Sequence, residues 1–225
     1  MIETIENTFQ LAVGGVCLSY SVVKCLQTKS RGWILLSLFY AEMFLGNVYW
    51  QLYQAFYDTI PQFPFVSEFC WNMSFAFLIL LVTLYSKGNV SIKKDPVLAF
   101  IPMFTLGCAI FYMTFGQIID NLVIAGLMAA LMMRSVYGLK TINGRSPYTG
   151  NEADPRAKKL FITILCFCTA EYLTWTASCF FWDDTIKNPY YWFDTLMAIT
   201  LIFLVPAVKA CDSPKYSMLS GEESL

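Results

Sequence analysis

Five acidic side chains interrupt stretches of this chain that are otherwise long and apolar: Glu42, Glu68, Asp120, Glu171 and Asp194. A charge in the hydrocarbon of a membrane costs a few kcal/mol on insertion scales, so an acid in such a stretch is by default a candidate functional group. Every Lys and Arg lies at the end of an apolar stretch or beyond it, which leaves no cation for an internal ion pair. A buried carboxyl group without a cation either takes up a proton or waits for a cationic ligand.

Aromatic side chains recur beside these acids at helical spacing. Glu171 and Trp175 share a helix face, and Glu42 and Tyr49 share another. Rings beside carboxylates suit an organic cation, through charge pairing and cation–π contact. We therefore predict one outward-facing cavity that binds a small cationic or polar ligand. Its predicted ligand-binding residues are Glu42, Trp50, Glu68, Trp71, Asp120, Glu171, Trp175 and Asp194.

Each acid also has a competing structural explanation. Glu68, Asp120 and Asp194 fall in the first turns of their segments, where a carboxylate can reach interfacial water or interact favourably with the helix dipole. Glu42 and Glu171 fall nearer the middle of their segments, where a hydrogen bond between helices is the main alternative.

The aromatic residues have competing explanations as well. Trp71 and Trp175 could be packing residues. The aromatic residues between positions 182 and 192 could form the belt that marks a membrane interface. The sequence leaves both alternatives open.

Several classes of chemistry are disfavoured by composition. The chain has no histidine, which excludes His-based acid–base catalysis and Ser-His-Asp triads. Its eight cysteines are scattered without metal-ligand spacing. No Gly-rich phosphate loop or basic groove is visible, and the net charge is −1. We expect no cofactor, no metal, no nucleic-acid partner and no enzymatic activity.

Long apolar segments are the elements that must position these residues. The chain is 57% hydrophobic and 14% charged, whereas soluble domains carry nearer a quarter charged residues. This composition predicts an all-α, polytopic protein of the cell membrane. Residues 1–211 are predicted to form one seven-helix transmembrane domain, and residues 212–225 a short cytoplasmic tail. The seven predicted helices span residues 8–27, 33–56, 64–86, 96–115, 117–138, 160–182 and 190–209.

The distribution of basic residues predicts the orientation. Of 15 Lys and Arg residues, only Lys187 falls on one side of the predicted bundle. The positive-inside rule then places the N-terminus outside and the C-terminus in the cytoplasm. The longest predicted cytoplasmic loop, residues 139–159, is the expected contact surface for a signalling partner.

Two segments suggest an internal repeat. Residues 58–68 read DTIPQFPFVSE, and residues 184–194 read DTIKNPYYWFD. Both begin Asp-Thr-Ile, and both place an acid ten residues later, at Glu68 and Asp194. The pattern predicts a 3+1+3 architecture, in which two parallel three-helix units are joined by an inverting fourth helix. Parallel repeats of this kind occur in transporters.

One region resembles a known family. The segments LGNVYWQLYQAF and FPFVSEFCWNMSFAFLILL, through Gly46, Trp50, Glu68 and Trp71, resemble the seven-helix membrane sensory modules that precede bacterial diguanylate cyclase domains. Those modules pair a Gly…Trp helix with an Asp/Glu…Trp helix behind a Pro-containing turn. The resemblance implies a membrane sensor. Since no output domain follows here, such a sensor would signal through a separate partner.

These features favour a receptor-like membrane protein that binds a small cationic or polar ligand. A small-solute transporter or channel with the same cavity is the alternative, and the repeat favours it. An intramembrane enzyme that modifies lipids, with paired carboxylates as acid and base, is the third and least favoured function.

Overall fold

The chain is almost entirely helical in the part that its computed structural model describes, which comprises residues 2–57, 65–86, 95–142, 154–180 and 185–212. A short 3-10 helix, Pro155–Ala157, precedes α6. The α-helices are α1 (Ile2–Thr28), α2 (Arg31–Tyr57), α3 (Phe65–Ser86), α4 (Pro96–Met113), α5 (Ile118–Ile142), α6 (Lys158–Ser178) and α7 (Pro189–Cys211).

Capping residues define where some of these helices begin. Asp95 precedes α4, and its side chain accepts a hydrogen bond from the backbone N–H of Val97. Asn188 precedes α7 and accepts in the same way from Tyr190. In both cases Pro is the first helical residue, where its missing N–H and fixed φ favour a helix start.

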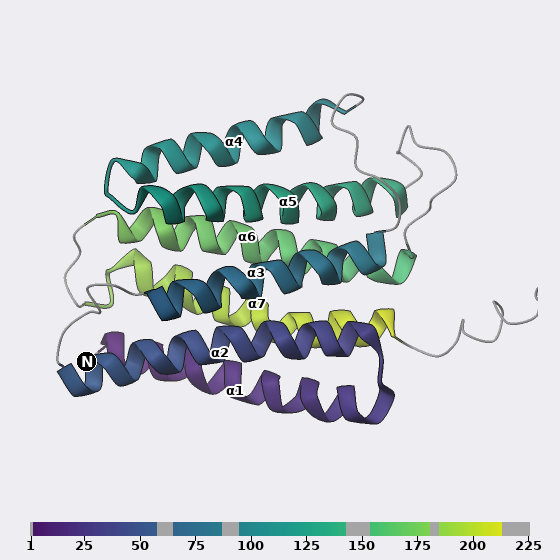
Figure 1. Cartoon of the computed structure of the whole chain (residues 1–225), viewed down its shortest axis with the longest axis horizontal. Coiled ribbons are helices and arrows are strands. Elements are labelled where there is room, and N and C mark those ends of the chain that lie inside the picture. Colours follow the sequence, from purple (N-terminus) through teal and green to yellow (C-terminus); the bar gives the residue numbers. More distant parts are fainter. Residues whose placement is uncertain (1, 58–64, 87–94, 143–153, 181–184, 213–225) are drawn as a thin grey trace, which may run out of the picture.

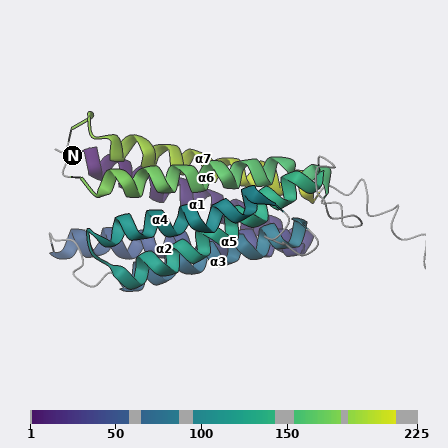
Figure 2. The same cartoon turned by 90° about the horizontal axis from the view of Figure 1, so that it is seen from above.

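Six of the helices form a closed ring around the long axis of the bundle. Each of α1, α2, α3, α5, α6 and α7 packs against the next, and α7 returns to α1. Helix α4 lies outside this ring and packs on α5, at the upper edge of Figure 1. Viewed from above in Figure 2, α6 and α7 lie on one side of the bundle and α2 and α3 on the other.

The outer faces of the bundle suit a lipid environment. Six helices, α1 and α3–α7, are long and apolar enough to cross a membrane. Large apolar side chains point outward on them, such as Val16, Phe100 and Met103, which are 70%, 61% and 71% exposed. The protein is therefore a multi-pass helical membrane protein. Helix α2 is not among these six, so a seventh span stays a prediction, as does the repeat.

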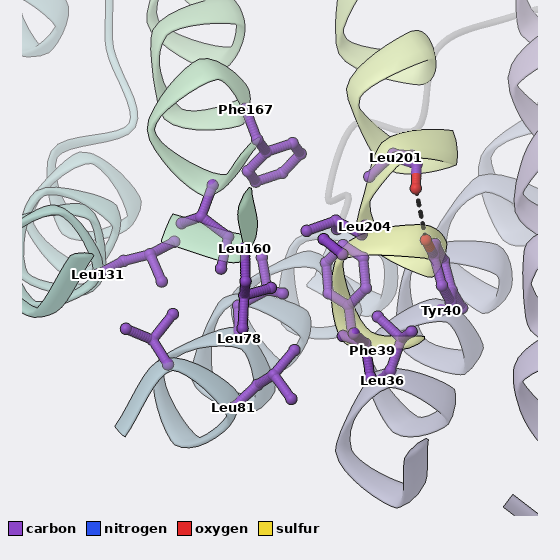
Figure 3. Close-up of a cluster of buried hydrophobic side chains, with 14 of the residues drawn as sticks. Leu36, Phe39, Tyr40, Leu78, Leu81, Leu131, Leu160, Phe167, Leu201 and Leu204 are labelled. Atoms are coloured by element: carbon purple, nitrogen blue, oxygen red, sulfur yellow. Dashed lines mark hydrogen bonds between the residues drawn. The ribbon is translucent and has the colours of Figure 1, made fainter. Parts of the chain in front are cut away.

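A dry core fills the middle of the ring and extends toward the end where α2 and α6 begin. Phe39, Leu78, Leu131 and Phe167 are all fully buried there (Figure 3). The hydroxyl of Tyr40 donates a hydrogen bond to the backbone carbonyl of Leu201, which ties α2 to α7 across the ring. This half of the bundle is therefore packed with buried apolar side chains.

The helix bounds differ from the predicted segments at several ends. Helix α1 begins at Ile2 instead of residue 8, because its polar first turns continue the same helix and bury Glu6 against the bundle. Helix α6 ends at Ser178 instead of residue 182, and α5 extends to Ile142 instead of residue 138. The start of both repeat segments, most of the loop 139–159 and nearly all of the tail lie outside the described residues.

Candidate ligand-binding cavity

A cavity of about 330 Å³ opens at one end of the ring. Its lining residues come mainly from the first turns of α1, α3, α5 and α7 and the last turns of α2 and α6. These helix ends lie at the left of Figure 1. Gln117 and Ser178 at its rim are exposed, whereas Phe75 and Asp194 at its floor are 2% and 3% exposed. Its size falls at the lower end of the range typical of small-molecule sites.

The cavity brings together residues that lie far apart in the sequence. All the sequence-predicted ligand-binding residues except Glu42 line it. They come from five helices: Trp50 on α2, Glu68 and Trp71 on α3, Asp120 on α5, Glu171 and Trp175 on α6, and Asp194 on α7.

Glu42 is placed elsewhere. Its carboxyl group interacts with the thiol of Cys70 on α3, and it is not among the lining residues. On α2 the face toward the cavity carries Met43, Asn47 and Trp50. The predicted face through Glu42 and Tyr49 is therefore rotated away from the cavity. The interaction with Cys70 on α3 favours the interhelical role that was the structural alternative for Glu42.

Each acid of the cavity accepts a hydrogen bond from a neutral side-chain N–H. These donors orient the carboxyl groups without neutralising them. The donor–acceptor pairs are Gln10 and Asp194 at 2.6 Å, Asn72 and Asp120 at 3.0 Å, Trp175 and Glu171 at 3.1 Å, and Gln117 and Glu68 at 3.3 Å.

The described residues place no protein cation in the cavity. Among the lining residues that the structure describes there is no Lys or Arg. The ion pairs Lys140–Asp95 and Arg156–Asp154 lie at the opposite end of the bundle. The negative charge of the cavity must therefore be balanced by protons or by a bound cation.

Aromatic rings form one wall. The ring centroids of Trp50 and Trp71 are 5.9 Å apart. A Cβ added to Gly46 would lie 2.7 Å from the indole nitrogen of Trp71, so this glycine allows the close approach of α3 to α2. Trp175 contributes a further ring from α6, beside Glu171. Such rings favour a cation that lies over their faces.

The sequence-based prediction missed the amides of the site. Asn7, Gln10, Asn47, Gln51 and Gln117 all line the cavity. Asn7 and Gln10 lie three residues apart and share one helix face, which was an available signal. Asn7, however, precedes residue 8, where the helix was predicted to begin. The buried carboxyl group of Glu6, which lies behind the cavity against Asp194, was missed as well.

Comparison of the chain with protein-family models, with curated proteins and with solved structures found no match in any of the three.

Proposed function

We propose that this protein is a receptor-like protein of the cell membrane that binds a small organic cation in the acidic, aromatic cavity, and that it is not an enzyme. The observation that carries the proposal is the set of four carboxyl groups, oriented only by neutral donors, in one cavity whose described lining has no basic side chain. A cation would supply the missing charge.

The shape of the site also favours a compact cation with apolar surface. The lining mixes carboxyl groups with Trp50, Trp71, Phe75 and Trp175. An ammonium group with methyl substituents can pair with an acid and contact ring faces at the same time. A dicarboxylate or a phosphate would be repelled by the same residues.

The dry half of the ring supports a receptor over a transporter. Phe75 and Met197 line the cavity, and both also belong to the apolar core that fills the ring around Phe39 and Leu78. A ligand could enter and leave at one end without crossing the bundle. Residues 143–153, within the loop expected to contact a signalling partner, lie outside the described part of the chain.

A small-solute transporter remains the second candidate. The peripheral position of α4, with α1–α3 and α5–α7 in the ring, fits the predicted 3+1+3 repeat. Transport would require the core to open toward the other end, as repeats of transporters do when they rock against each other.

Choline and its neutral analogue 3,3-dimethylbutan-1-ol, which has carbon in place of the ammonium nitrogen, provide a matched test. Calorimetry on the purified full-length protein in lipid nanodiscs should show saturable binding of choline and none of the alcohol. Equal binding of both, or of neither, would contradict a cation site. Uptake of labelled choline into liposomes that contain the protein would favour the transporter, and binding without uptake the receptor.

A further inference from the structure

One acid of the cavity, Asp194, is paired with a further buried acid that does not line the cavity. Glu6 on α1 and Asp194 on α7 are 6% and 3% exposed, and their carboxyl groups lie within hydrogen-bonding reach of each other. Asp194 lines the cavity, whereas Glu6 does not. A ligand in the cavity can therefore contact Asp194 directly, whereas it can affect Glu6 only through Asp194.

The described residues offer Glu6 no donor that would stabilise a negative charge. In the described part of the chain, no N–H or O–H donates a hydrogen bond to either of its carboxyl oxygens. Two ionised carboxylates can only accept hydrogen bonds, so a hydrogen bond between Glu6 and Asp194 requires a proton on one of them. The arrangement therefore contains a position for one proton.

The surrounding side chains determine which acid carries it. The indole N–H of Trp71 can only donate, and it donates to the carbonyl oxygen of Asn47 at 3.1 Å. The amide nitrogen of Asn47 therefore faces the carbonyl oxygen of Gln10, at 3.3 Å. Gln10 in turn donates to Asp194 at 2.6 Å.

The three hydrogen bonds donated by Trp71, Asn47 and Gln10 form a series that ends at Asp194. Hydrogen bonds to the charged form of a carboxyl group favour that form. The negative charge is therefore favoured on Asp194, and the proton on Glu6.

The remaining titratable groups near the pair are acids or a phenol. Glu3 on α1, Glu171 on α6 and Tyr190 on α7 interact electrostatically with one or both members. Helix α2, which also packs against α1 and α7, contributes amides such as Asn47. No Lys or Arg from the described helices is among these neighbours, so a proton is the positive charge that the protein itself can place here.

We propose that Glu6 and Asp194 form a proton-binding site coupled to the cavity, and that a cation bound beside Asp194 displaces the proton held by Glu6. In this exchange the O–H bond of Glu6 breaks, its electron pair stays on the carboxylate, and the proton passes to water. The entering cation balances the charge that remains. By linkage, cation affinity then rises as the pH rises and the site loses its proton.

The coupling rests on the proposed function, but the proton site can be tested without any ligand. Infrared spectra of the purified full-length protein, recorded at neutral and alkaline pH, report the C=O stretch of protonated carboxyl groups. We expect wild-type protein to show a component that Glu6→Gln removes. Glu3→Gln is the matched control, since Glu3 lies one turn earlier on α1 and is exposed; it should leave that component in place.

If Glu6→Gln removed no component, the proton site would be disproved, whether or not the cavity binds choline. Should Glu6→Gln not fold, Asp194→Asn replaces it and should shift the frequency of the Glu6 band, and an unshifted band would equally disprove the pair.

The coupling is tested with choline in weakly buffered solution and a pH indicator. Wild type and Glu3→Gln should release about one proton for each choline bound, and Glu6→Gln should bind choline with little release. Binding by wild type without proton release would overturn the exchange. If the infrared band of Glu6 were present but choline did not bind, the proton site would be supported, and the ligand class of the proposed function would be refuted.

Discussion

Glu171 is the acid at which a mutation best distinguishes a role in ligand binding from a role in helix packing. It is half-buried in the cavity wall, and its one described side-chain donor is Trp175, four residues later on the same helix. It therefore makes no hydrogen bond between helices in the described contacts, in contrast to Glu42, which interacts with Cys70 on the neighbouring helix. This difference makes the two acids a matched pair for mutagenesis.

Glu171→Gln should weaken choline binding by about 1–3 kcal/mol, the usual contribution of a hydrogen bond or contact to a charged group. The fold should be retained, because the amide has nearly the size of the acid and can still accept from Trp175. Glu42→Gln should leave choline affinity unchanged. Calorimetry on both variants measures the difference, and an equal loss in both would argue that these acids act through packing.

A different acid, Asp95, stabilises the fold at the opposite end of the bundle. Lys140 on α5 donates to Asp95 at 2.7 Å, and the backbone N–H of Val97 donates to it at 3.0 Å. Burial opposes ionisation of this carboxyl group, but the hydrogen bonds and the charge of Lys140 outweigh burial and lower its pKa. The contact ties the start of α4 to the end of α5.

Because the pKa of Asp95 is lower in the folded protein, its contribution to stability is present above the pKa of the unfolded chain. It is lost as the pH falls through the lower folded pKa. Asp95→Asn, which keeps the cap, should lower the free energy of unfolding by about 1.5–3 kcal/mol near neutral pH. Asp95→Ala should cost about 1 kcal/mol more through loss of the cap. Thermal unfolding across the acid range checks this, and a gap between wild type and Asp95→Asn that did not narrow on acidification would contradict it.

At the scale of elements, the positions of the helices were predicted more accurately than the side of each helix that faces the cavity. Long apolar runs predict membrane helices because the bilayer sets their length, and seven α-helices are present within the described residues. The polar residues Glu3, Glu6 and Asn7 hid the true start of α1, because their polarity resembles a segment outside the membrane. On α2, polar and aromatic residues cover several faces, so spacing alone could not distinguish the Glu42 face from the Asn47 face.

Acids were also easier to find than amides. A carboxylate in an apolar run is conspicuous because of its cost, whereas Asn47 and Gln117 carry no charge and fit many positions. The contact between Glu6 and Asp194 joins the two ends of the described chain. Only the closed ring, in which α7 returns to α1, brings them together.

Packing between α2 and α3 positions the aromatic wall, which leads to a prediction at Gly46. A Cβ there would lie 2.7 Å from Nε1 of Trp71 and 3.3 Å from Cβ of Cys70. Gly46→Ala should displace the indole, break its hydrogen bond to Asn47 and cost about 1–3 kcal/mol of stability through overpacking. Choline affinity should fall with it.

Gly107 on α4 offers the matched control, since a Cβ added there would meet nothing within 4 Å. Gly107→Ala should leave choline affinity unchanged and stabilise α4 by up to about 1 kcal/mol, as Ala does relative to Gly in a helix. Calorimetry and thermal unfolding of both variants measure these effects. An unchanged affinity in Gly46→Ala would show that the position of Trp71 does not matter for binding.

For the whole molecule, the two ends of the ring differ in chemistry. One end holds the acidic cavity, and the other holds Arg31, Lys140 and Lys158 near the helix termini. The dry core between them separates the ends. If the positive-inside rule applies, the cavity opens away from the cytoplasm.

This orientation predicts which positions can be labelled from outside an intact cell. Ser178, exposed at the rim of the cavity, and Lys158, exposed at the other end of the same helix, form a matched pair on α6. In a background without the native cysteines, Ser178→Cys should react with a membrane-impermeant thiol reagent in intact cells. Lys158→Cys should react only after the membrane is permeabilised, because a dry core and the bilayer lie between the two sites. Adding choline before the reagent should slow labelling of Ser178→Cys, since a bound cation would occupy the cavity beside it. Labelling of Lys158→Cys, but not of Ser178→Cys, in intact cells would show that the cavity faces the cytoplasm. The ligand would then be an internal solute.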